Sequence, residues 1–200
     1  EYTKYILKGG DHLLELIDEV LDLVKIESGR AGLTIEPVTP RHVIQECLVL
    51  VRSLAANRSI AVTEQLDFTE PSKIDVDATR FRQVLLNLLS NAVKYNREGG
   101  SIVLSGRNTS SGHLRIGITD TGFGIAEDRQ EELLQPFSRL GAECTEIEGT
   151  GIGLHLSKNL VGLMGGTIGF ETREGKGSTF WVKFPLSADQ DVSDTAKQIE

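Results

Sequence analysis

Two glycine clusters, one following a strand and one opening a helix, constrain this 200-residue chain most strongly. The first is Asp120-Thr-Gly-Phe-Gly-Ile125, and the alternating residues Leu114, Ile116 and Ile118 before it predict a strand that ends at Asp120. The second is Gly149-Thr-Gly-Ile-Gly-Leu154, which is followed by apolar residues at helical spacing. Glycine suits positions where backbone turns sharply or lies directly against a ligand. Because a helix N-terminus offers free N–H groups to phosphate, the pair predicts a nucleotide site, with the base at the first cluster and the phosphates at the second.

Neither cluster is a common phosphate-binding loop. The chain has no G-x-x-x-x-G-K-[ST] segment, and Gly149-Thr-Gly-Ile-Gly153 lacks the glycine spacing and the preceding strand of a dinucleotide-binding fold. Taken alone, each cluster also fits a structural turn. The lone carboxylate of Asp120 suits a hydrogen-bond donor such as an exocyclic amine, which favours the nucleotide interpretation.

Composition indicates a soluble globular chain, with 39% hydrophobic and 25% charged residues. A net charge of −8 argues against a broad nucleic-acid surface, so we expect no nucleic-acid partner. No apolar run approaches the roughly 18 residues of a membrane span. Cys47 and Cys144 show no metal or redox spacing, which favours the cytoplasm. Since the chain starts without Met and in mid-pattern, we expect a fragment whose parent is anchored to a membrane, if at all, through parts not present here.

Residues 1–29 predict one long helix of a helical bundle. One apolar stripe follows the a and d positions of a heptad repeat, at Leu7, Leu14, Ile17, Leu21 and Val24. A second, adjacent stripe consists of Leu13, Leu16, Val20 and Leu23. Two stripes make an apolar face too wide for a surface helix, so partner helices are implied, and we expect them from a second copy of the chain.

The rest of the chain alternates between strand and helix patterns. Apolar alternation predicts strands at residues 33–36, 60–66, 74–76, 101–107, 113–119, 167–171 and 178–185, and we expect Pro37 to stop the first of them. Helical spacing predicts helices at residues 40–57, 77–96 and 126–134 and one opened by the second glycine cluster. From Ser187 onward the chain is polar and aperiodic, which is typical of a tail or linker.

Three polar residues follow one side of the helix predicted at 77–96. Asn87, Asn91 and Lys94 are four and three residues apart, so they line up along the helix axis. Asparagine is a poor helix former, so helix propensity does not explain two of them on one stripe. The stripe is either an exposed polar face or a site where amide oxygens bind a hard cation and the lysine binds phosphate.

Four segments occur in the order of the N, G1, F and G2 boxes: Asn87-Leu-Leu-Ser-Asn-Ala-Val-Lys-Tyr95, Asp120-Thr-Gly-Phe-Gly124, Pro136-Phe137 and Gly149-Thr-Gly-Ile-Gly153. Over roughly residues 33–186 the chain therefore resembles the catalytic, ATP-binding domain of a bacterial sensor histidine kinase. The wider superfamily includes type II topoisomerases and related chaperone and mismatch-repair ATPases. The resemblance implies an α+β fold, a Bergerat-type two-layer α/β sandwich with a mixed sheet on three main helices. It also implies that residues 1–29 are the second helix of a dimerisation bundle and residues 187–200 a tail or linker.

The resemblance implies ATP and Mg²⁺ as cofactors and carries roles over to individual residues. Asn91 is similar to the Mg²⁺ ligand of the family and Asn87 supports it, while Lys94 and Arg139 are expected to reach phosphate. The other nucleotide contacts that it implies are Tyr95, Asp120, Gly122, Gly124, Ile125, Phe137, Gly149, Thr150, Gly151, Gly153, Leu154 and Thr179.

The function implied is that of a protein-histidine kinase in a two-component system. Such a homodimer transfers the γ-phosphoryl group of ATP to a histidine on the dimerisation helix, for relay to an aspartate of a response regulator. The family's phosphoacceptor motif is absent around all four histidines, so we expect the acceptor upstream of Glu1. One alternative is a non-catalytic nucleotide-sensing or scaffold module of the same fold. A hydrolytic ATPase is disfavoured, because the superfamily's ATPases place a glutamate base at position 87 and asparagine cannot take a proton.

Overall fold

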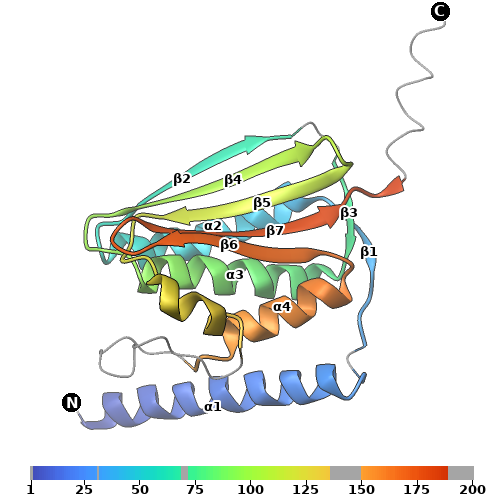
Figure 1. The fold of residues 1–200 in the computed structure, drawn as a ribbon. Helices are drawn as coiled ribbons and strands as arrows, with labels where there is room; N and C mark the ends of the chain where they lie inside the picture. Colours follow the sequence, from blue (N-terminus) through green and yellow to red (C-terminus); the bar gives the residue numbers. More distant parts are fainter. Residues whose placement is uncertain (1, 31, 69–71, 136–149, 189–200) are drawn as a thin grey trace, which may run out of the picture.

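A five-stranded mixed sheet forms one layer of the protein (Figure 1). The computed structural model describes residues 2–30, 32–68, 72–135 and 150–188. The strand order is β2-β4-β5-β7-β6, in which β2 and β4 are parallel and the other neighbours are antiparallel. The strands are β2 (Ala61–Asp67), β4 (Ser101–Thr109), β5 (His113–Asp120), β6 (Thr167–Arg173) and β7 (Gly177–Pro185).

Three helices cover one face of this sheet (Figure 1) and complete the predicted two-layer α/β sandwich. They are α2 (Pro40–Ala56), α3 (Ala78–Lys94) and α4 (Gly153–Leu163). Their buried side chains pack on the inward-facing residues of β4, β5 and β7, and the rings of Phe81 and Phe184 meet edge to face at 5.6 Å. Between β5 and α4 the predicted short helix is a 3₁₀ helix, η1 (Glu127–Glu132).

Asp77 starts α3 and ties it to the preceding linker. Its Oδ1 accepts from the backbone N–H of Arg80 at 3.0 Å, as an N-cap does, and its Oδ2 accepts from the N–H of Thr34 at 3.0 Å. Burial alone would raise the pKa of Asp77, but these N–H donors outweigh burial and lower it. The helix that carries the two asparagines therefore has a fixed starting point.

A second, two-stranded sheet pairs β1 (Glu36–Val38) with β3 (Ile74–Val76). The prediction that Pro37 stops a strand at residues 33–36 is wrong, because Pro37 lies inside β1 and pairs with Asp75. Within the described residues β1 pairs with β3 alone, and edge strands tolerate proline. Ser187, which we expected to begin the tail, is buried, and its hydroxyl donates to Asp75 at 2.7 Å. The packed domain therefore reaches Ser187.

The N-terminal helix α1 (Tyr2–Glu27) runs along α4 on the side away from the sheet (Figure 1). Its first predicted stripe is exposed. The second stripe divides: Leu13 and Val20 are exposed, whereas Leu23 is buried at 7% exposure and Leu16 packs against the core. Within the described ranges, no helix has the length and apolar character that crossing a bilayer requires.

Candidate functional site

Helix α3 presents the two asparagines beside α4. The amide Nδ2 of Asn87 donates to Ser157 Oγ at 2.8 Å, and Asn91 Nδ2 lies 3.5 Å from Asn87 Oδ1. In the described part of the chain, Asn91 Oδ1 has no hydrogen-bond partner, so one amide oxygen stays available to a ligand. Lys94 and Tyr95 follow on the last turn of the helix and its C-cap, and both are exposed. The predicted stripe of Asn87, Asn91 and Lys94 thus lies on α3, and Tyr95 follows it.

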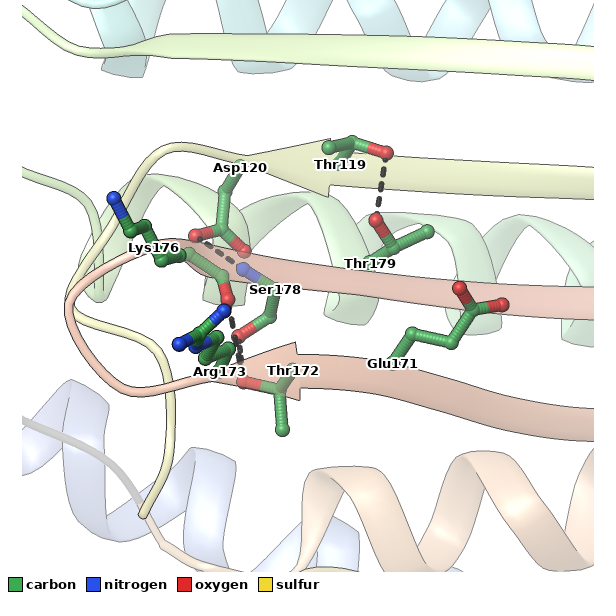
Figure 2. Close-up of a pocket in the computed structure, with 9 residues that line it drawn as sticks. Thr119, Asp120, Glu171, Thr172, Arg173, Lys176, Ser178 and Thr179 are labelled. Carbon is green, nitrogen blue, oxygen red and sulfur yellow. Dashed lines mark hydrogen bonds between the residues drawn. The ribbon is translucent and has the colours of Figure 1, made fainter. Parts of the chain in front are cut away.

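Asp120, the proposed contact for the base, lies at the end of β5. The side chain is only 6% exposed, and its Oδ1 accepts from the backbone N–H groups of Gly122 at 2.8 Å and Ser178 at 3.3 Å. Oδ2 accepts no hydrogen bond from the described residues, and only one carboxylate oxygen is bonded in Figure 2. Burial raises the pKa of Asp120 although both N–H groups act to lower it. A ligand donor at Oδ2 would supply the stabilisation that this desolvated carboxylate lacks.

The first glycine cluster threads between α3 and the β6–β7 hairpin. A Cβ on Gly122 would lie 2.2 Å from the backbone oxygen of Tyr95, and one on Gly124 would lie 2.0 Å from that of Arg173. Gly124 also has a φ of +65°, which disfavours other residues. The backbone N–H of Ile125 donates to Thr172 Oγ1 at 3.0 Å. We expected these glycines to make room for a base. The atoms with which a Cβ at Gly122 or Gly124 would clash belong to the protein's own backbone.

The second glycine cluster joins α4 to α3. Gly151 has a φ of +73°, and a Cβ on Gly153 would lie 2.5 Å from Asn87 Oδ1. Gly153 therefore allows the start of α4 to lie against the polar stripe of α3. Thr150 Oγ1 accepts from the N–H of Ile152 at 3.2 Å, and Leu154 packs against the hydrophobic core.

The expected role of Thr179 does not agree with the geometry. Its hydroxyl pairs with that of Thr119 at 2.9 Å, in a row of side chains on the face of the sheet away from the helices (Figure 2). Side chains alternate along a strand, so the preceding residue, Ser178, faces the helix side together with Asp120. Ser178 is buried and its hydroxyl pairs with Thr172 Oγ1 at 2.8 Å. The hydroxyl beside Asp120 is therefore that of Ser178.

A cavity of about 290 Å³ lies at the hairpin end of β5, β6 and β7 (Figure 2). It is lined by Thr119, Asp120, Glu171, Thr172, Arg173, Lys176, Gly177, Ser178 and Thr179. No described residue of α3 or α4 lines it, and Asp120 is part of its lining. Three further predicted contacts, Phe137, Arg139 and Gly149, lie outside the described residues.

Sequence reasoning missed two residues that hold the end of α3 in place. Asn96 has no exposed surface; its Oδ1 accepts from the N–H of Arg97 at 2.9 Å and from Thr121 Oγ1 at 3.2 Å, and its Nδ2 donates to Ser101 O at 3.1 Å. Arg58 donates to the backbone oxygens that end α3, including Lys94 O at 2.9 Å. The sequence signal for Asn96 was its place between the helix and the Gly-Gly turn, where asparagine often satisfies local backbone. Arg58 gave no such signal.

Residues 76–188 match the model of the family described as histidine kinase-, DNA gyrase B-, and HSP90-like ATPase. This segment is more than half of the 200-residue chain and contains Asn87, Asn91 and Asp120. The chain belongs to this ATPase family. The match also confirms the predicted resemblance to the ATP-binding domain of sensor histidine kinases and the expected fold class.

Named relatives and a solved structure agree with this membership. The circadian input-output histidine kinase CikA of Synechococcus elongatus is 40% identical over 190 residues, which cover 92% of this chain and 25% of CikA. The sensor protein GacS of Pseudomonas syringae pv. syringae is 35% identical over 190 residues, covering 93% of this chain and 21% of GacS. The crystal structure of full-length ShkA in complex with AMPPNP has a TM-score of 0.81 and 28% identity, and the match covers 93% of this chain and 38% of ShkA. This member of the ATPase family thus spans a quarter or less of either curated relative.

Proposed function

We propose that this chain binds Mg-ATP and transfers the γ-phosphoryl group to a histidine on a bundle helix, for relay to a response-regulator aspartate. The observation that carries the proposal is the buried carboxylate of Asp120, which keeps one oxygen free at the end of β5. An adenine amine would donate to that oxygen. Guanine would present a carbonyl oxygen there instead, and two facing acceptors would disfavour it by about 1–3 kcal/mol.

The phosphates would lie at the start of α4, near Asn91 and Lys94 of the polar stripe. The N–H groups at the start of α4 and the ammonium of Lys94 supply positive charge, and Arg139 is expected to add to it. Magnesium fits this donor set, because it takes one or two protein oxygens, keeps several waters and binds phosphate, and Asn91 Oδ1 is free. When bound, the ion would neutralise charge on the phosphates. The residues of this chain would position the nucleotide, which is most of what phosphoryl transfer asks of an enzyme.

Asn87 favours transfer over hydrolysis. Its Nδ2 already donates to Ser157, and an amide cannot take a proton from an attacking water. The γ-phosphoryl group therefore needs an external acceptor that brings its own nucleophile, as a histidine does. A hydrolytic ATPase remains the second candidate, but this contact argues against it.

The proposed partners follow from α1 and from the relatives. In this proposal residues 1–29 are the second helix of a dimerisation bundle, residues 33–186 the catalytic domain and residues 187–200 a tail or linker. The exposed stripe of α1 would pack against bundle helices of a second copy. The response regulator is proposed because CikA is a named histidine kinase and GacS a named sensor protein.

Substituting Asn91 tests the nucleotide site. Because even outer-shell changes lower metal affinity by about 10- to 100-fold, Asn91→Ala should weaken Mg-ATP binding by at least about tenfold in calorimetry. Affinity for ATP in the presence of EDTA should change little. The matched control is Asn57→Ala, at the exposed end of α2. Unchanged Mg-ATP affinity in Asn91→Ala would reject the metal role.

Adding the phosphoacceptor helix in trans with γ-labelled ATP tests the transfer. A kinase places an acid-labile, base-stable label on that helix. Steady release of labelled phosphate without a labelled helix would indicate an ATPase. Binding without either product would indicate a nucleotide-sensing module.

A further inference from the structure

Helix α1 contacts the catalytic domain through polar groups at two places, besides lying along α4 (Figure 1). Near the start of α4, the hydroxyl of Thr150 donates to the carboxylate of Glu19. Near the start of α3, the guanidinium of Arg80 binds Asp22 through both oxygens, Nη1 to Oδ2 at 2.6 Å and Nη2 to Oδ1 at 3.3 Å. Gln83 Nε2 donates to the same Oδ2 at 3.3 Å. One helix thus touches the first turn of α3 and the loop that opens α4.

The contact is more than a surface ion pair. The side chains of Arg80 and Asp22 are only 28% and 19% exposed. Burial alone would raise the pKa of Asp22, but the hydrogen bonds from Arg80 and Gln83 outweigh it and lower the pKa. A bidentate arginine–carboxylate pair also has a defined geometry, unlike a typical exposed pair. The Asp22 contact therefore fixes where α1 sits.

Apolar residues on the same face of α1 support these contacts. Leu23 is 7% exposed, and Leu16 and Ile26 pack against the core. With Glu19 and Asp22 they share one side of the helix, since they recur three, four and seven residues apart. We call these five residues the docking face of α1. The exposed stripe that begins at Leu7 lies on the opposite side of α1, so it stays exposed when α1 is docked.

The docking face meets the catalytic domain where the phosphates are proposed to bind. Thr150 Oγ1 already accepts from Ile152 N–H, so its single hydrogen is the donor that Glu19 takes. A phosphate at the start of α4 would need the same donor. It would also face the negative carboxylate of Glu19 across a short distance.

We propose that docked α1 competes with the nucleotide for the start of α4, with Glu19 in the place of a phosphate oxygen at Thr150. This inference rests on the proposed function. Release of the docking face exposes Thr150, and bound nucleotide in turn disfavours docking, because coupling between two ligands of one site is reciprocal. Movement of α1 away from the catalytic domain thereby raises the nucleotide affinity.

The test measures the Kd of AMPPNP for the whole 200-residue chain and three variants. Glu19→Gln removes the competing charge. Asp22→Asn weakens docking through residues outside the proposed nucleotide site. The control, Asp18→Asn, removes an exposed charge one turn before Asp22. Glu19→Gln and Asp22→Asn should each lower the Kd by about fivefold or more, while Asp18→Asn should stay within about twofold of the parent chain. Thermal unfolding confirms that each variant is folded.

Three results would overturn the competition. The first is a Kd for both Glu19→Gln and Asp22→Asn within about twofold of the Kd of the unsubstituted chain. The second is an effect of Glu19→Gln without one of Asp22→Asn, which would be local to Thr150. The third is a failure of the proposed function itself, recognised because the released variants also bind no AMPPNP at millimolar concentration.

A second measurement tests whether bound nucleotide releases α1 from the catalytic domain. In a Cys144→Ser background, Leu23→Cys places a thiol on the docking face, and burial raises the pKa of the remaining Cys47 to about 11, so Cys47 reacts slowly. Saturating AMPPNP should speed maleimide labelling of the new thiol by at least the factor that Asp22→Asn gains in affinity in the same Leu23→Cys background. An unchanged labelling rate would overturn the proposal.

Discussion

Replacing Asp120 by asparagine should weaken nucleotide binding without weakening the fold. The carboxamide has nearly the same shape, so its oxygen can still accept from Gly122 N–H and Ser178 N–H. Its nitrogen then takes the place of the free Oδ2 and turns an acceptor into a donor. The adenine amine would lose a charge-assisted hydrogen bond and face another donor. Together these changes correspond to about 2–4 kcal/mol, or roughly a 30- to 1000-fold rise in Kd.

The effect on stability should have the opposite sign. Burial raises the pKa of Asp120 above the ordinary value of 3.8, so the folded protein holds the proton more tightly than the unfolded chain does. The contribution of Asp120 to stability therefore falls as pH rises from about 3.8 through the folded-state pKa. Asparagine has no such dependence. The stability of Asp120→Asn relative to the parent chain should increase over the same pH range.

Calorimetry with AMPPNP and urea unfolding from pH 4 to 7 measure the two effects on the same preparation. Asp67→Asn, at the exposed end of β2, is the matched control and should change neither. An unchanged nucleotide Kd for Asp120→Asn would refute the assignment of its free oxygen. A loss of stability at pH 7 comparable to the loss of affinity would show that Asp120 is structural.

Two further predictions follow from the packing of α4 and from the alternation along β7. Gly153→Ala should destabilise the protein by about 1–3 kcal/mol in urea unfolding, because its Cβ would strike Asn87 Oδ1. Gly162→Ala has open space around its Cβ and should stabilise α4 by up to about 1 kcal/mol. Equal stabilities of the two variants would contradict this packing. Ser178→Ala should raise the Kd for AMPPNP and Thr179→Ala should leave it unchanged, and the reverse order in a binding titration would restore the original expectation for Thr179.

Local patterns in the chain were sufficient for most of the architecture. Helical spacing identified α2, α3 and α4, and alternation identified the strands of the main sheet, because both periods are set by neighbours a few residues apart. The four boxes then identified the family, and the stripe of Asn87 and Asn91 was correctly placed on one side of α3. Asp120 was correctly placed at the end of a strand.

The exceptions all depend on contacts between distant parts of the chain. The expectation for Thr179 came from the family resemblance alone. The faces of β7 are assigned only when it is paired with β5, and a shift of one residue exchanges them. The buried bonds of Asn96 reach Ser101 and Thr121, which only the folded sheet brings to the end of α3.

The sequence by itself determined the family and the residues proposed for a nucleotide site, since boxes, caps and periodicities are written into short stretches of chain. Only the tertiary structure decided what else those residues touch. Gly122 is required by the backbone of Tyr95, and Thr150 is held by Glu19, 131 residues earlier in the chain. No local pattern encodes such a contact, because it exists only when the packing of α1 and α4 brings the two residues together.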